Sequence, residues 1–162
     1  MAKELKTNVM RILDAAKIPY RAYYYDNKDG KIDGVSVAKK LGQNAERVYK
    51  TLVTRGAGGE PFVFVVPVAE ELDLKAAAKS VGEKSVEMIH VNEINKITGY
   101  IRGGCSPVGM KKPFRTVIDS SCEKIPSMCV SAGRIGTQVE VGPKALIELT
   151  GASVAPIAQK TV

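Results

Sequence analysis

Lys50 is the first residue in the sequence whose type and setting could do chemistry. It stands in the run Val48-Tyr49-Lys50-Thr51-Leu52, whose other residues are mostly apolar and typical of a strand. An ammonium group in such a strand could point into a cleft and meet a phosphate or a carbonyl oxygen. The same alternation also fits a lysine that faces solvent, so the pattern alone leaves both readings open.

A glycine-rich loop at residues 103–109 is the second candidate, with the sequence Gly-Gly-Cys-Ser-Pro-Val-Gly. The adjacent glycines Gly103 and Gly104 allow positive φ angles and a close approach of a ligand to the backbone. Free N–H groups in such a turn can bind an oxyanion or a phosphate, and Ser106 adds a hydroxyl. The alternative is a plain connecting loop.

Two further segments carry groups that suit a nucleotide. The small-residue turn at residues 131–136 contains Ser131 and Arg134, and the arginine is either a phosphate contact or an exposed hairpin tip. Tyrosines 23 to 25 could stack on a base or pack in the core.

Several common centres are missing from the sequence. Its one histidine, His90, lies in an apolar stretch and is expected to be structural or on the surface. The three cysteines fit neither a CxxC pair nor a zinc knuckle, and reduced thiols are expected. Neither a P-loop nor a GxGxxG motif is present. The sequence therefore predicts no metal and no cofactor.

Length and charge bound the class of protein. The chain has 162 residues, which suits a single domain over residues 1–162. Its net charge of +7 favours a polyanion partner such as RNA, with residues 111–115 as the one local basic cluster. No apolar run is long enough to span a bilayer, and residues 1–6 lack the apolar core of a secretory signal. A cytoplasmic location with no membrane contact is therefore expected.

The pattern of elements predicts an α/β (or α+β) domain. Helices and strands are interleaved without a regular βαβ rhythm, which favours a mixed, curved, barrel-like sheet with peripheral helices. Helices are expected at residues 4–17, 36–41, 74–81, 92–99 and 143–149, with N-caps at Ser36, Asp73 and Asn92 and a capped short turn after Asn44. Strands are expected at residues 21–26, 49–54, 62–67, 86–88, 116–119, 128–131, 138–141 and 154–157.

Taken together, these segments resemble the YbaK/EbsC family, relatives of the editing domain inserted in bacterial prolyl-tRNA synthetases. The resemblance covers nearly the whole chain, and its most specific part is Lys50-Thr51-Leu52 followed downstream by the 103–109 loop. The other matching stretches are Ile18-Pro19-Tyr20 with Tyr25-Asp26, then residues 74–82, residues 98–100 and residues 130–134.

The resemblance implies a curved α/β editing domain that removes a wrong amino acid from tRNA. Within the family the chain looks most like the free-standing deacylases that act on cysteine mischarged onto proline tRNA and on Cys-tRNA(Cys). It implies aminoacyl-tRNA, chiefly tRNA(Pro), and prolyl-tRNA synthetase as partners. It also implies Lys50 as the catalytic residue and the following residues as contacts to the substrate: Tyr25, Thr51, Gly103, Gly104, Ser106, Ser131 and Arg134.

In this family the thiol of the substrate can attack its own ester carbonyl, which suits a site without a triad or a metal. Three alternatives stay open: removal of another amino acid such as alanine from tRNA(Pro), a tRNA-binding module without catalysis, and a hydrolase that uses Cys105 as nucleophile. Cys105 replaces a residue that is usually aliphatic in the family. Gln138 departs from the small or acidic residue of relatives and is left outside the predicted site.

Overall fold

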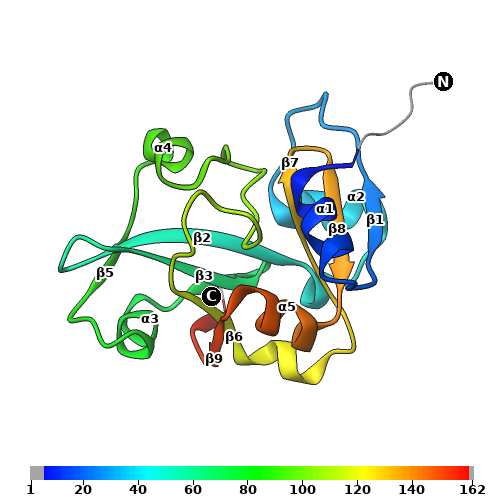
Figure 1. The fold of residues 1–162 in the computed structure, drawn as a ribbon. Helices are drawn as coiled ribbons and strands as arrows, with labels where there is room; N and C mark the ends of the chain where they lie inside the picture. Colours follow the sequence, from blue (N-terminus) through cyan, green and yellow to red (C-terminus); the bar gives the residue numbers. More distant parts are fainter. Residues whose placement is uncertain (1–5, 161–162) are drawn as a thin grey trace.

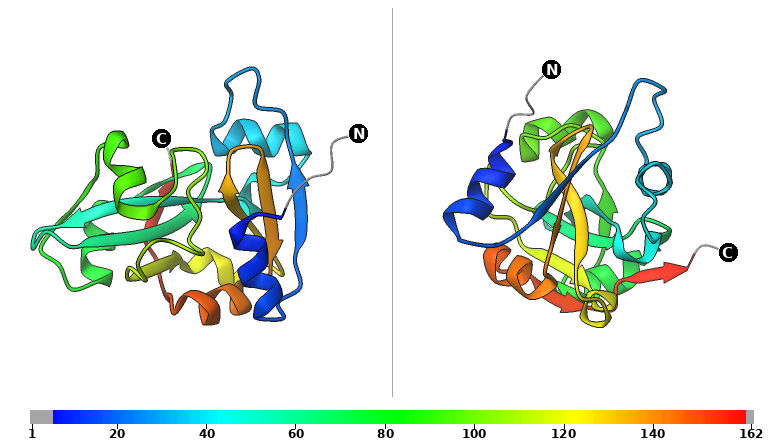
Figure 2. Two further views of the ribbon diagram at one scale, coloured as in Figure 1. Left: turned by 45° about the horizontal axis from the view of Figure 1, so that its top comes forward. Right: turned by 90° about the vertical axis from the view of Figure 1, so that its right-hand side faces the viewer.

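The computed structural model describes residues 6–160 as a mixed α/β fold (Figures 1 and 2). The helices are α1 (Asn8–Ala15), α2 (Gly34–Leu41), α3 (Leu74–Ser80), α4 (Ile94–Thr98) and α5 (Pro143–Thr150), with the 3-10 turns η1 (Ala45–Arg47), η2 (Val91–Glu93) and η3 (Ser120–Lys124). The strands are β1 (Arg21–Tyr24), β2 (Tyr49–Gly56), β3 (Pro61–Pro67), β4 (Glu70–Leu72), β5 (Val86–Met88), β6 (Thr116–Asp119), β7 (Met128–Arg134), β8 (Thr137–Val141), β9 (Ser153–Ala155) and β10 (Ala158–Lys160).

The strands form three open sheets in the described part of the chain. The largest is a mixed five-stranded sheet in the order β5-β2-β3-β6-β9, in which β3, β6 and β9 run parallel. A three-stranded antiparallel sheet has the order β1-β8-β7, and β10 pairs with β4. The expected mixed α/β architecture is confirmed. The expected barrel-like form is not confirmed, because none of these sheets closes on itself.

Alternating residues of β3 belong to two different hydrophobic cores. Phe62, Phe64 and Val66 pack with α3 and Ile157 on one face of the five-stranded sheet. Val65 belongs to the other core, where α1, α5 and the three-stranded sheet meet. Figure 1 shows this second sheet, with α1 beside it, standing at one end of the five-stranded sheet. Because successive side chains of a strand point to opposite faces, β3 contributes to the packing on both sides of the five-stranded sheet.

Local capping explains most helix boundaries. Asn44, Asp73 and the pair Gly142-Pro143 begin η1, α3 and α5 as the sequence predicts. α1 begins at Asn8, later than expected, because the Thr7 hydroxyl accepts from the Met10 N–H at 3.2 Å. The remainder of that prediction, residues 4 and 5, lies outside the described residues.

Two predicted N-caps are wrong. α2 is capped by Asp33 instead of Ser36, because the Asp33 carboxylate accepts from both the N–H and the hydroxyl of Ser36, at 3.1 and 2.7 Å. The helical segment expected after an Asn92 cap begins earlier, with His90 as the N-cap of η2, and η2 leads into α4. The Glu93 carboxylate accepts from the backbone N–H of His90 at 3.2 Å. His90 is exposed, which is the second of the two expected positions, structural or on the surface.

Candidate active site

A cleft of about 690 Å³ lies between the two main sheets. The two sheets approach each other where Val48, directly before β2, forms an isolated bridge with Cys129 of β7. On the outer edge of β2, β5 pairs only with Thr54–Gly56, so the first half of that edge lines the cleft. The loop before α2 and the start of the 103–109 loop complete its walls. The cleft is thus bounded by segments from four distant parts of the sequence.

Five of the predicted site residues line this cleft. Tyr25 directly follows β1, and Lys50 and Thr51 belong to β2. Gly103 opens the glycine-rich loop, and Ser131 belongs to β7. The fold therefore brings together side chains that are more than 100 positions apart between Tyr25 and Ser131.

Lys50 places a half-buried ammonium group in the cleft. Burial lowers the pKa of Lys50 below its ordinary value, and the carboxylate of Glu71 partly opposes this effect. No hydrogen bond or ion pair is made by the Lys50 side chain to any other residue in the described range. A partly desolvated cation without a protein partner can bind a carbonyl, hydroxyl or phosphate oxygen of a ligand.

Thr51 and Ser131 bring hydroxyl groups to the same cleft. The Thr51 hydroxyl oxygen is buried and lacks a hydrogen-bond partner among residues 6–160. A buried hydroxyl without a partner costs about 1–3 kcal/mol, so a ligand that bonds it recovers this energy. The Ser131 hydroxyl accepts from the Gly133 N–H at 3.2 Å and keeps its own proton available for donation.

The two adjacent glycines have different surroundings. Gly103 has φ +86°, and a Cβ placed on it would lie 2.7 Å from Cδ1 of Ile32. A Cβ on Gly104 would lie 3.0 Å from Cα of Arg134 and 3.1 Å from the Ile135 nitrogen. Gly103 therefore lines the cleft beneath Ile32, whereas Gly104 is buried against the backbone of the turn between β7 and β8.

Ser106 and Arg134 lie away from the cleft lining. The fully buried Ser106 hydroxyl accepts from the Val108 N–H at 3.2 Å and shapes the 103–109 loop from within. Arg134 is exposed, and its Nε donates to the Thr137 hydroxyl at 3.0 Å. The structure thus separates Gly104, Ser106 and Arg134 from the five predicted residues that it gathers.

Gln138 lines the cleft although the sequence prediction leaves it out. It is 4% exposed, and its side-chain oxygen accepts from Nε2 of Gln43 at 2.6 Å. The signal in the sequence is a polar side chain on the buried strand β8, next to Val139. Such a residue needs a polar partner or a ligand, and the sequence does not show which.

Cys105 also lines the cleft, with its thiol in a desolvated position. Burial raises the pKa of Cys105 to about 11, against a hydrogen bond with Thr98 that lowers it. The carboxylate of the cleft, on Asp33, is engaged by Ser36 in the N-cap of α2. Neither group is arranged as a nucleophile with its base, so the cleft is suited to binding and polarising a ligand that brings its own nucleophile.

The described part of the chain contains neither a metal-binding cluster nor a membrane-spanning helix. In residues 6–160 no group of three His, Cys, Asp or Glu side chains is arranged to hold a metal ion. Nor does any helix there have the length and apolar character to cross a membrane.

Comparison with known proteins identifies relatives of this chain by sequence. The model of the aminoacyl-tRNA editing domain family matches residues 33–149. An Enterococcus faecalis protein named "Putative Cys-tRNA(Pro)/Cys-tRNA(Cys) deacylase EbsC" is 44% identical over 155 residues, which cover 96% of this chain and 94% of that protein.

Solved structures share the fold. A crystal structure of "hypothetical protein APE2540" superposes with a TM-score of 0.85 at 24% identity and covers 93% of this chain and 99% of its own. A crystal structure described as "a putative trans-editing enzyme for prolyl tRNA synthetase" gives a TM-score of 0.79 at 24% identity, over 96% and 99% of the two chains. The family model spans most of the chain and the E. faecalis relative matches nearly all of it, so this chain belongs to the aminoacyl-tRNA editing domain family.

Proposed function

We propose that this chain, as one domain over residues 1–162, is a cytoplasmic trans-editing deacylase that removes cysteine from mischarged tRNA(Pro) and acts also on Cys-tRNA(Cys). The observation that carries the proposal is the unpartnered Lys50 ammonium in a cleft with no nucleophile–base pair. Thr51, whose buried hydroxyl also lacks a partner in the described chain, lines the same cleft. The name of the E. faecalis relative supports the substrate. Its partners are aminoacyl-tRNA and prolyl-tRNA synthetase, a pairing that the description of one structural relative supports.

The proposed reaction uses the thiol of the cysteinyl ester as nucleophile. The sulfur attacks the ester carbonyl carbon, a C–S bond forms, and the C–O bond to the terminal ribose breaks. The thiol proton passes to the departing ribose oxygen, which leaves tRNA with a free hydroxyl and cysteine as a four-membered thiolactone. An intramolecular attack of this kind gains up to about 7–11 kcal/mol from proximity when the geometry is held.

The residues of the cleft have distinct roles in this proposal. The Lys50 ammonium stabilises the negative charge that develops on the carbonyl oxygen. Tyr25, Thr51, Gly103 and Ser131 contact the aminoacyl-adenosine end. Gly104 and Ser106 shape the loop that carries Gly103, and Arg134 lies on the outer surface, where it could meet a tRNA phosphate.

Deacylation of Cys-tRNA(Pro) and Ala-tRNA(Pro), measured side by side, tests this proposal. Rapid loss of cysteine with little loss of alanine is expected, because alanine has no thiol. Release of alanine at a comparable rate would show that water is the nucleophile and that the enzyme is not specific for cysteine. Binding of both without turnover would identify a tRNA-binding module instead.

Replacing Cys105 by serine is expected to leave deacylation within about twofold of wild type. A thiol whose pKa is raised to about 11 is almost fully protonated at pH 7–8 and is a poor nucleophile. Single-turnover deacylation of Cys-tRNA(Pro) by Cys105→Ser, and by wild type after alkylation, measures this. A loss of activity of 100-fold or more in the serine variant would establish the cysteine-dependent mechanism in place of the substrate thiol.

A further inference from the structure

The segment at residues 26–33, here called the cleft loop, contributes Gly30, Ile32 and Asp33 to one wall of the proposed active site. Its own hydrogen bonds are short-range. The Asp26 carboxylate accepts from the Lys28 N–H at 2.9 Å, and the Asp29 carboxylate accepts from the Lys31 N–H at 3.0 Å. Bonds of this kind give the loop its turns but do not fix it against the rest of the protein.

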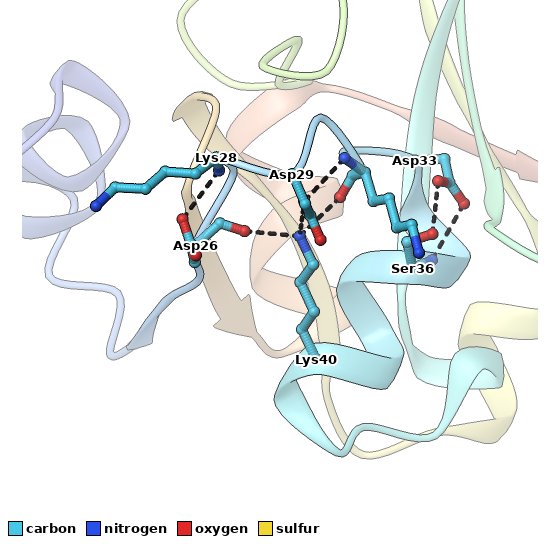
Figure 3. Close-up of polar contacts among 7 residues, drawn as sticks. Asp26, Lys28, Asp29, Asp33, Ser36 and Lys40 are labelled. Carbon is cyan, nitrogen blue, oxygen red and sulfur yellow. Dashed lines mark hydrogen bonds and ion pairs between the residues drawn. The ribbon is translucent and has the colours of Figure 1, made fainter.

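Lys40, in the last turn of α2, makes the connection that the loop itself lacks. Its ammonium group donates to the backbone oxygen of Asp26 at 2.7 Å, to Oδ1 of Asp29 at 2.8 Å and to the backbone oxygen of Lys31 at 3.0 Å. Figure 3 shows the Lys40 side chain rising from the helix toward the inside of the loop. All three ammonium protons are thereby engaged by one segment of chain.

The helix that carries Lys40 is itself well fixed. Asp33 caps its first turn through Ser36, and Val37 and Ala38 are buried. A Cβ on Gly34 would lie 2.1 Å from Cγ1 of Val68, so the first turn of α2 packs closely on the chain that follows β3. Lys40 therefore ties the cleft loop to a stable reference in the fold.

The far end of the cleft loop contacts the glycine loop across the cleft. Ile32 lies so close to Gly103 that an added Cβ there would be 2.7 Å from Cδ1 of Ile32. Ile32, Gly103, Lys50 and Thr51 all line the same cleft. The position of the cleft loop thus sets how Ile32 covers the part of the cleft that would hold the ester.

We propose that Lys40 is a positioning residue for editing: it holds the cleft loop so that Ile32 closes over the aminoacyl end of the substrate beside Gly103. The inference rests on the proposed deacylase function. Lys40 does not line the cleft itself and acts through Asp26, Asp29 and Lys31. Without it the loop keeps its turns and its join to α2 at Asp33, but the segment from Asp26 to Lys31 loses its attachment to the helix. This weakens the hold on the ester without removing the group that polarises it.

The test compares Lys40→Met with Lys39→Met, its neighbour on α2. Both variants remove one positive charge from the same helix, so long-range attraction to tRNA changes equally. We expect Lys40→Met to raise KM for Cys-tRNA(Pro) about 10-fold, to lower kcat less than KM rises, and to keep its Tm within a few degrees of wild type. Lys39→Met should keep wild-type KM, and Lys40→Arg should recover part of the loss.

A second readout follows the loop without any substrate. Trypsin should cut after Lys28 and Lys31 several times faster in Lys40→Met than in Lys39→Met, with the sites located by mass spectrometry. Equal KM values and equal cleavage rates in these two variants of an active enzyme would overturn the role of Lys40. A wild-type chain that does not deacylate Cys-tRNA(Pro) would overturn the proposed function first, and with it any editing role for Lys40, even where trypsin shows that Lys40 secures the loop.

Discussion

Replacing Lys50 by alanine is expected to lower single-turnover deacylation of Cys-tRNA(Pro) by about 100- to 1000-fold, the usual effect of removing a group that stabilises an oxyanion. Lys50 places a half-buried ammonium group in the cleft without a protein partner among the described residues, so its removal breaks no internal ion pair. The loss should therefore appear in the rate of the chemical step, while the thermal unfolding midpoint changes little.

Lys75→Ala is a matched control for this variant. Lys75 is an exposed lysine on α3 that does not line the cleft, so its removal changes the net charge equally and leaves the site intact. It should deacylate Cys-tRNA(Pro) at close to the wild-type rate. Near-normal activity of Lys50→Ala would refute the proposed role of Lys50, and a fall in both variants would point to a general charge effect.

The pH dependence gives a further check on the Lys50 prediction. Burial lowers the pKa of Lys50, so its ammonium form is lost at a lower pH than that of an exposed lysine. If the ammonium form polarises the ester, the enzyme-dependent rate should fall as pH rises through this lowered pKa. That alkaline fall should be absent from the residual rate of Lys50→Ala, after subtraction of spontaneous ester hydrolysis.

Elements defined by local chemistry could be predicted from the sequence, and elements defined by distant partners could not. Asp73 and Gly142-Pro143 begin helices because a side-chain acceptor or a fixed φ acts within the first turn. β4 and β10 were not predicted. Each has three residues and is stabilised by the other, through a register that pairs Glu71 with Gln159. Neither segment has an alternating pattern long enough to indicate a strand by itself.

The cleft illustrates the same limit. The family resemblance points to Lys50 and Thr51, yet alternation along β2 cannot show that β5 stops pairing at Thr54 and leaves the preceding edge open. Gln138 is left outside the predicted site because it departs from the small or acidic residue of relatives, and nothing near it in the sequence reveals its bond to Gln43. The contact of Ile32 with Gly103 depends on the folded positions of two loops. Cleft residues that belong to a recognisable motif could therefore be predicted from the sequence. Those that reach the cleft only through the packing of distant segments could not.

Replacing Asp119 by alanine is expected to lower the free energy of unfolding by about 3 kcal/mol. Asp119 is 6% exposed, and its carboxylate accepts from the N–H groups of Ile157 and Ala158, both at 2.9 Å, and of Ser121 at 3.1 Å. Alanine leaves these donors without their acceptor in a water-poor environment. In a protein of this size the loss corresponds to a fall in Tm of roughly 6–12 °C, measured by thermal and urea unfolding.

Asp119→Asn separates loss of the acceptor from loss of the charge. The asparagine carbonyl can still accept the paired bonds from Ile157 and Ala158, so a smaller loss of about 1 kcal/mol is expected. Since Ile157 precedes β10 and its carbonyl accepts from the Asp73 N–H at 2.7 Å, the alanine variant should loosen the β4–β10 pair first. Hydrogen exchange should then be faster in β4 and β10 than in β2 and β3. An alanine variant as stable as the wild type would show that the three backbone donors find other acceptors and that Asp119 does not secure β10.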